Sequence, residues 1–262
     1  MVDDSKHDGR EGFEHSTLKK GILKRCAEFL FDFESRVSRA SAFAAHRRLL
    51  LAQWRLAPAP EWFDHSIDLL YQWSATNNSL WVERGVFGGL ALKGGRLLEL
   101  SCGDGFNAKH FYAHRSKEVI ACDFDPSAIH TANKKNFSPN VTFVLADIRT
   151  QMPTGIFENI VWDAAIEHFH PNEIDLIMSN IKRRLTNDGI LSGHTIVERT
   201  DGVKQLHQHE YEFKDMEDLK RFLTPHFKNV KVFQTIYPDR HNLYFWASDS
   251  SIPFDTGWLN CA

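Results

Sequence analysis

One short stretch, residues 96–107, constrains the fold of this chain more than any other. Its sequence is Arg-Leu-Leu-Glu-Leu-Ser-Cys-Gly-Asp-Gly-Phe-Asn, and its three leucines predict a buried strand. Gly103 and Gly105 follow, where a sharp turn and the close approach of a ligand both favour a residue without a side chain. A helical pattern begins at Ala108, and its first backbone N–H groups point at the turn. Strand, glycine turn and helix together predict a loop that binds a nucleotide-type cofactor.

Two interpretations of this loop differ in the cofactor that they predict. The spacing Gly103-x-Gly105-x-x-Ala108 fits dinucleotide-binding loops, which hold a pyrophosphate. In this chain, however, Glu99 lies near the end of the strand and Asp104 lies between the glycines. Two carboxylates repel a pyrophosphate and attract a cation, so the charges favour a cationic cofactor that lacks phosphate.

Acidic residues also end the next two predicted strands. Residues 118–123 form an apolar run that ends in Asp123, about 20 residues past the loop, where a carboxylate can accept hydrogen bonds from ribose hydroxyls. Residues 141–146 precede Asp147 in the same way. A single Asp at a strand end is common in turns. Three successive strands that end in Glu99, Asp123 and Asp147 instead indicate a shared site.

These residues resemble the first motifs of the class I S-adenosylmethionine-dependent methyltransferases, and the likeness extends over most of residues 96–248. Within this family, the chain is loosely similar to the small-molecule enzymes of bacterial surface-glycan pathways. The family implies an α/β fold with a Rossmann-like, seven-stranded, mostly parallel sheet and an antiparallel hairpin strand at the C-terminal edge. It also implies S-adenosyl-L-methionine as the cofactor, bound by the matching residues Glu99, Ser101, Gly103, Asp104, Gly105, Asp123, Phe124, Asp147, Ile148 and Asp163.

The resemblance assigns a role to several of these residues. Asp123 would bind the ribose hydroxyls, and Phe124 would lie against the adenine. Asp147 would meet the adenine amino group while Ile148 packs on the ring. Asp163, at the end of the fourth strand, would contact the amino-acid end of the cofactor.

The rest of the chain is arranged around this domain of residues 96–248. Residues 1–16 are polar and are expected to be mobile. Residues 17–95 are predicted to form an N-terminal helical cap over one edge of the sheet, and residues 249–262 form a tail. Apolar spacing and helix-start signals predict helices over 18–37, 40–56, 60–73, 80–92, 126–135, 171–185 and 215–222. Further strands are predicted over 158–165, 190–197, 229–237 and 242–247.

Composition excludes several classes of partner. The formal net charge of −3 and a pI near 6.5 provide no field for a polyanion, and residues 163–166 lack the N/D-P-P-Y motif of nucleic-acid amino-methyltransferases. No apolar run approaches the roughly 20 residues that span a membrane. The four cysteines lack CxxC spacing, which suits reduced thiols in a cytoplasmic protein. We therefore expect a small-molecule acceptor, no nucleic acid and no membrane partner, and the oligomeric state stays open.

Methyl transfer to a hydroxyl requires alignment of the acceptor and removal of its proton. In open parallel sheets, ligands meet beyond the carboxyl ends of the strands. His168 follows the fourth strand and is the first choice for the general base, because the unperturbed pKa of imidazole is about 6.5. His194 and His209 are the alternatives.

The same segment allows a second chemistry. Glu167 and His168, with His194, His207 or His209, have the donor types of a metal site. Certain methyltransferases that act on RNA ends or quinone precursors have a Glu-His pair here that binds a divalent ion. They carry another acid three residues before the Glu, where this chain has Ala164. On this ground no metal is predicted.

The sequence thus predicts an S-adenosylmethionine-dependent methyltransferase that acts on a small polar molecule. A sugar or sugar-nucleotide hydroxyl is placed slightly ahead of an amine as the acceptor. The alternatives are an N-methyltransferase of a small amine and a non-catalytic cofactor-binding subunit. A nicotinamide oxidoreductase is disfavoured by the carboxylates around the loop.

Overall fold

The computed structural model describes residues 9–55, 62, 65, 80–238 and 240–254. The chain divides into two compact units, Met1–Arg55 and Leu56–Ala262. This boundary falls inside the segment 17–95 that was predicted as one helical cap, so the N-terminal helix and the helix before the glycine loop belong to different units. Most of the helix predicted over 60–73 lies outside the described residues.

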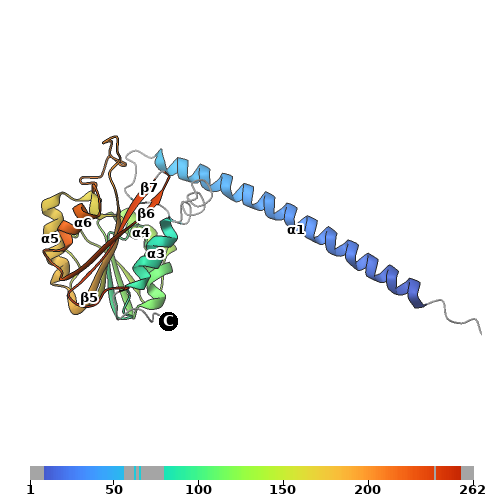
Figure 1. Ribbon diagram of the computed structural model, residues 1–262, viewed down its shortest axis with the longest axis horizontal. Coiled ribbons are helices and arrows are strands. Elements are labelled where there is room, and N and C mark those ends of the chain that lie inside the picture. Colours follow the sequence, from blue (N-terminus) through green and yellow to red (C-terminus); the bar gives the residue numbers. More distant parts are fainter. Residues whose placement is uncertain (1–8, 56–61, 63–64, 66–79, 239, 255–262) are drawn as a thin grey trace, which may run out of the picture. The chain divides into compact units, whose positions relative to one another are not determined.

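The described part of the first unit is one continuous helix, α1 (Gly9–Trp54), drawn in blue in Figure 1. Residues 9–16, which were expected to be mobile, belong to this helix, and the predicted break between residues 37 and 40 is absent from it. Residues 22–54 contain neither glycine nor proline, the residues that interrupt helices most strongly, which accounts for the continuity. Most apolar side chains of α1 whose burial is described are exposed; Phe29, for example, is 71% exposed.

The second unit is built on a seven-stranded sheet with the strand order β3-β2-β1-β4-β5-β7-β6. The first five strands pair in parallel, whereas β7 pairs antiparallel with both β5 and β6. The predicted Rossmann-like sheet with an antiparallel C-terminal hairpin is confirmed. The strands are β1 (Arg96–Leu100), β2 (Glu118–Asp123), β3 (Val141–Leu145), β4 (Phe157–Asp163), β5 (Leu185–Ile196), β6 (Asn229–Tyr237) and β7 (Arg240–Ser248).

Five helices of this unit begin close to their predicted starts: α3 (Leu80–Leu90), η1 (Ala108–Tyr112), α4 (Pro126–Lys135), α5 (Pro171–Lys182) and α6 (Met216–Leu223). The short helix η2 (Ala113–Arg115) continues the pattern that begins at Ala108, and η3 (Ile166–His168) was not predicted. The end of α5 differs, because the helix was predicted to reach residue 185 and the next strand to begin at residue 190, whereas α5 ends at Lys182 and β5 begins at Leu185. A register shift between Phe157 and Asn159 lets the early part of β5 continue to pair with β4.

Helices cover both faces of the sheet, and Figure 1 shows α5 and α6 on the opposite side from α3. Successive strand residues point to opposite faces. Leu98 accordingly packs in the core beneath α5 and α6, whereas its neighbour Leu97 packs in the core beneath η1. Because both faces are apolar and covered, a polar site is left to the carboxyl edge of the parallel strands.

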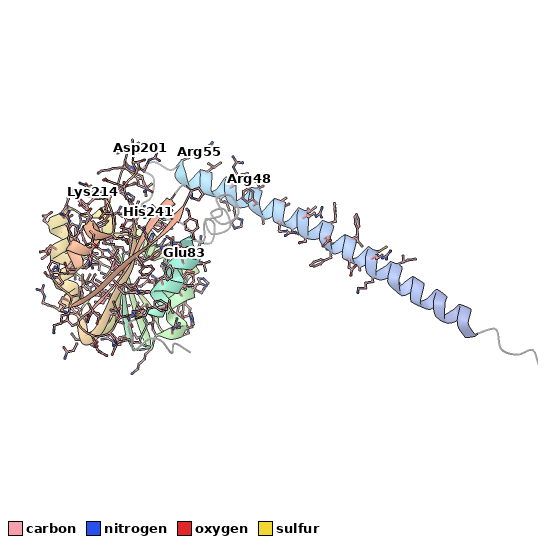
Figure 2. All side chains as sticks on the ribbon, viewed as in Figure 1. Arg48, Arg55, Glu83, Asp201, Lys214 and His241 are labelled. Carbon is pink, nitrogen blue, oxygen red and sulfur yellow. The ribbon has the colours of Figure 1, made fainter. Side chains whose placement is uncertain are left out.

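Glu83 fastens α3 to the antiparallel hairpin, and Figure 2 labels this side chain on the helix. Its carboxylate accepts hydrogen bonds from the hydroxyls of Thr235 (2.9 Å) and Tyr244 (2.8 Å), and also from Tyr237. Burial, together with the nearby Glu83 carboxylate, raises the pKa of Tyr244, so its hydroxyl stays a neutral donor.

Among the described helices, none has the length and apolar character that a membrane crossing requires.

Candidate functional site

The glycine turn between β1 and η1 contains three residues with positive φ: Ser101 (54°), Gly103 (53°) and Gly105 (73°). The predicted sharp turn is therefore present. At Gly105, packing adds a second requirement, because a Cβ atom there would lie 2.4 Å from the ring of Phe143. Glycine at this position thus serves the turn, as predicted, and also the packing of the core, which the sequence argument did not foresee.

Asp104 was predicted to bind the cofactor, but its carboxylate is engaged within the protein. It accepts hydrogen bonds from His65 N (3.0 Å), His65 Nδ1 (2.9 Å) and Phe106 N (3.1 Å), and Asp104 is fully buried. Burial alone would raise the pKa of Asp104, but the hydrogen bonds from His65 hold it below its usual value. Asp104 therefore anchors His65 to the glycine turn, a contact that no local sequence pattern indicates.

The three strand-end acids lie at the same edge of the sheet. Strands β3, β2 and β1 are parallel neighbours, with Leu100 paired to Cys122 and Asp123 paired to Leu145. Glu99, Asp123 and Asp147 therefore mark the carboxyl ends of three adjacent strands, as the sequence predicts. Their roles in cofactor binding remain predictions, and their surroundings differ.

Glu99 differs from the other two acids in having a carboxylate oxygen without a donor among the described residues. It is 2% exposed, and its Oε2 atom is buried without a hydrogen-bond partner among the described residues. Burial, followed by the negative charge of Asp163, raises the pKa of Glu99 well above its usual value, and Arg84 opposes this rise. A buried acceptor without a donor is costly, so a ligand group that donates a hydrogen bond or carries positive charge fits this place.

Asp123 is held by the backbone of two loops. Its carboxylate accepts hydrogen bonds from Gly103 N (2.9 Å) and Asp125 N (2.9 Å), and Asp123 is 6% exposed. Asp123 thus fixes the position of the glycine turn relative to the end of β2. Phe124, the residue predicted to lie against adenine, follows it and is 52% exposed.

We expect Asp123→Ala to lower the free energy of unfolding of the ligand-free protein by about 1–3 kcal/mol, because the buried N–H of Gly103 loses its acceptor. Binding of the predicted cofactor should weaken at least about tenfold. Urea unfolding and calorimetry measure the two effects. Asp147→Ala is the control for stability, with an expected loss of about 1 kcal/mol or less. Unchanged stability of Asp123→Ala would contradict the anchoring role.

Asp147 forms a local pair at the end of β3. Arg149 donates to both of its carboxylate oxygens at 2.7–3.1 Å, and these hydrogen bonds lower the pKa of Asp147. Asp147 is half-buried, and the neighbouring Ile148 is 3% exposed. Contact of these residues with adenine stays a prediction.

Asp163 is part of a buried ion pair that the sequence argument missed. Arg84 of α3 donates to its Oδ2 through Nε (2.7 Å) and Nη2 (2.5 Å), and Asn107 Nδ2 donates to the same atom (2.8 Å). Arg84 and Asp163 are 6% and 7% exposed. Arg84 balances the charge of Asp163. The contact predicted between Asp163 and the amino-acid end of the cofactor stays a prediction, and it would involve the ion pair rather than a carboxylate alone. The only sequence signal for it is an arginine inside the otherwise apolar run 84–92.

His194 was predicted as an alternative base, and the structure places it inside the sheet. The side chain lies in β5, is 0% exposed and packs at 5.0 Å against the ring of Tyr244. Burial, and then the charges of Arg84 and Arg240, lower the pKa of His194 well below its usual value. The Oδ1 atom of Asp163 lies 3.7 Å from the Nδ1 of His194, which is buried without a hydrogen-bond partner among the described residues.

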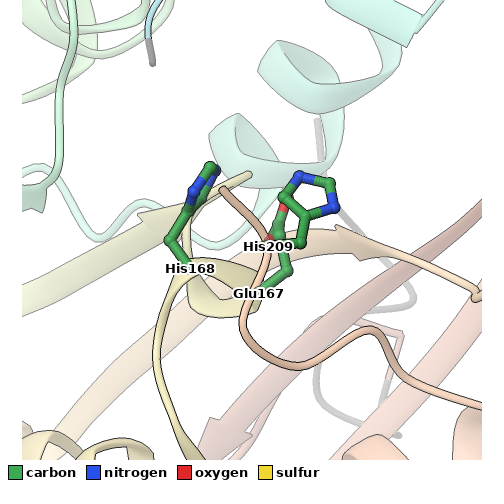
Figure 3. Close-up of side chains that lie close together, drawn as sticks. All are labelled: Glu167, His168 and His209. Atoms are coloured by element: carbon green, nitrogen blue, oxygen red, sulfur yellow. The ribbon is translucent and has the colours of Figure 1, made fainter. Parts of the chain in front are cut away.

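The other two predicted histidines come together at the carboxyl end of β4 (Figure 3). The rings of His168 and His209 lie 4.9 Å apart at 85°, and ligand-type atoms of Glu167, His168 and His209 lie within 4.8 Å of one another. His168 is half-buried, whereas Glu167 and His209 are 3% and 2% exposed. His168 is therefore the more exposed of the two imidazoles. The sequence argument had named His209 as one of three possible partners of Glu167 and His168, and the structure brings His209 to them, although Ala164 still stands where the related metal sites have an acid.

Backbone hydrogen bonds hold this loop against η3. The carbonyl of Glu167 accepts from Glu210 N (2.8 Å) and Tyr211 N (3.0 Å), and Glu198 N donates to the carbonyl of Phe213 (2.8 Å). Lys204 Nζ also donates to the carbonyl of His209. The convergence of His168 and His209 is thus built into the loop between β5 and α6.

Comparison with known proteins identifies the central part of this chain. Residues 97–189 match the family model of a methyltransferase domain. A search of curated protein sequences finds no match to the chain.

Several solved structures share the fold at low sequence identity. The structure of DhpI in complex with SAH has a TM-score of 0.55 at 17% identity, and the match covers 81% of this chain and 97% of DhpI. The N-methyltransferase NodS from Bradyrhizobium japonicum WM9 has a TM-score of 0.54 at 19% identity, covering 67% and 99%. TehB from Haemophilus influenzae has a TM-score of 0.52 at 16% identity, covering 68% and 66%.

Proposed function

We propose that this chain, whose residues 97–189 form a methyltransferase domain of the class I fold, transfers a methyl group from S-adenosyl-L-methionine to a hydroxyl of a small polar acceptor. The acceptor that we favour is a sugar or sugar nucleotide. The observation that supports methylation at oxygen is the half-buried imidazole of His168, at the sheet edge that also carries Glu99. A hydroxyl needs a group that takes its proton, whereas a neutral amine does not.

The residues at the edge fit this cofactor, which carries a sulfonium and an ammonium but no phosphate. The buried Oε2 of Glu99 lacks a donor and suits a positively charged or hydrogen-bond-donating group. Asp123 ends the neighbouring strand, where ribose hydroxyls can reach it, and the exposed ring of Phe124 offers adenine an apolar face. When bound, the cofactor supplies an activated methyl group on a good leaving group.

The protein's own task is to align the acceptor and manage one proton. His168 lies beyond the carboxyl end of β4, at the place where ligands of open parallel sheets meet. We assign to His168 the removal of the proton from the acceptor hydroxyl. His209 is held by Glu212 through Nδ1 (2.5 Å) and packs against His168, so it orients the reactive imidazole.

Calorimetry on the full chain tests the choice of cofactor. We expect binding of S-adenosylmethionine or S-adenosylhomocysteine and none of NAD, because a pyrophosphate beside Glu99 and Asp123 would bring like charges together. Tight NAD binding with no response to either adenosyl compound would contradict the proposal.

Turnover with pools of small metabolites then separates an enzyme from a non-catalytic cofactor-binding subunit. Mass spectrometry of the product identifies the methylated atom. A methylated amine as the sole product would replace the hydroxyl acceptor by an amine and leave the cofactor assignment unchanged.

A further inference from the structure

We infer that Glu167, His168 and His209 bind a divalent transition-metal ion of the zinc class beside the methyl-transfer site. One carboxylate and two imidazoles form a donor set that suits Zn²⁺ and related ions better than Mg²⁺, which prefers oxygen ligands. The three potential ligand atoms lie within 4.8 Å of one another, and Figure 3 shows the side chains converging from η3 and the loop that follows β5.

The charge of Glu167 is the first observation that points to a cation. Glu167 is 3% exposed, and among the described residues no Lys or Arg forms an ion pair with it. Its Oε2 accepts one hydrogen bond, from the hydroxyl of Thr195 (2.9 Å). A buried carboxylate with a single neutral donor is expensive, and a bound cation removes that cost.

The two histidines are the second observation. Glu212 engages Nδ1 of His209 at 2.5 Å, so this nitrogen carries the proton and Nε2 is left as the acceptor. A carboxylate that orients a histidine in this way is the usual support of a metal-ligating imidazole. The Nδ1 atom of His168 is buried without a hydrogen-bond partner among the described residues. Each ring therefore offers one nitrogen to which the described residues form no hydrogen bond.

Three protein ligands leave at least one coordination position open, as in catalytic zinc sites. The role that follows rests on the proposed function. An acceptor hydroxyl bound at the open position loses its proton to solvent more readily, because the ion stabilises the alkoxide. The alkoxide oxygen then bonds to the methyl carbon while the carbon–sulfur bond breaks and its electron pair stays on sulfur. In the loaded protein, His168 acts as a ligand, and the acceptor class is narrowed to molecules whose oxygen can coordinate a metal.

Calorimetric titration of the chelator-treated full chain with ZnCl₂ tests the site independently of methyl transfer. We expect one Zn²⁺ per chain and no comparable binding of Mg²⁺. His209→Ala and Glu167→Gln should each raise the dissociation constant for Zn²⁺ at least about 100-fold, and Glu212→Gln should raise it about 10–100-fold. Co²⁺ absorption in the visible range reports the coordination geometry in the same variants.

His207→Ala is the matched control, because His207 is exposed, lies in the same loop and is absent from the cluster. It should bind Zn²⁺ as the wild type does, and circular dichroism establishes which variants are folded. The inference is overturned if the wild type binds no Zn²⁺, or if folded Glu167→Gln and Glu212→Gln bind it unchanged. Methyl transfer that persists in chelator with no Zn²⁺ binding would sink the metal site and leave the proposed function standing. Zn²⁺ binding without any cofactor binding would contradict the proposed function and leave the metal site standing.

Discussion

Replacing His168 by alanine is expected to reduce the turnover number by about 10²–10⁴-fold, the usual contribution of a group that removes a proton. The reduction is expected whether the imidazole takes the proton itself or holds an ion that promotes its loss. Steady-state kinetics with the identified acceptor measures the reduction.

Cofactor binding is the internal control for this variant. No cofactor contact is assigned to His168, so the dissociation constant for S-adenosylmethionine should stay within about twofold of the wild type, a difference well below 1 kcal/mol. If His168→Ala retains activity and His209→Ala loses it, the group that removes the acceptor's proton is His209, in the loop after β5. If neither variant changes turnover, alignment alone suffices and the acceptor is a neutral amine.

Removal of Arg84 is expected to produce the largest loss of stability. Arg84→Ala leaves the carboxylate of Asp163 buried without its charge partner, which typically costs about 3–5 kcal/mol. Burial alone would lower the pKa of Arg84, yet the adjacent Asp163 raises it above the usual value, so the pair is charged in the folded protein. Urea unfolding of the ligand-free variant measures the loss.

Two further variants separate the pair from other effects of the substitution. Arg199→Ala breaks an ion pair with Asp201 whose partners are 55% and 47% exposed, and it should leave stability unchanged. The double variant Arg84→Met with Asp163→Leu should recover most of the loss, because it removes both charges together. A single variant Arg84→Ala as stable as Arg199→Ala would show that solvent reaches Asp163.

The amino-acid sequence by itself determined where most strands lie. Apolar runs separated by helical patterns predict the strands, and the resemblance to a known family implied their parallel pairing and the C-terminal hairpin. Because the carboxyl ends of parallel strands share one edge, Glu99, Asp123 and Asp147 could be expected there together. These features are local or follow from topology, so they can be deduced from the chain in one dimension.

Contacts between distant residues were decided only by the tertiary structure. Asp104 meets His65 across 39 residues, and Arg84 meets Asp163 across 79. No periodicity marks such pairs, since each partner taken alone is an ordinary turn or helix residue. The same holds for His209, which was predicted as one of several alternatives. The hydrogen bonds of its loop to η3 bring it beside Glu167 and His168, and the way the chain folds back on itself thereby determines which of its 14 histidines share a site.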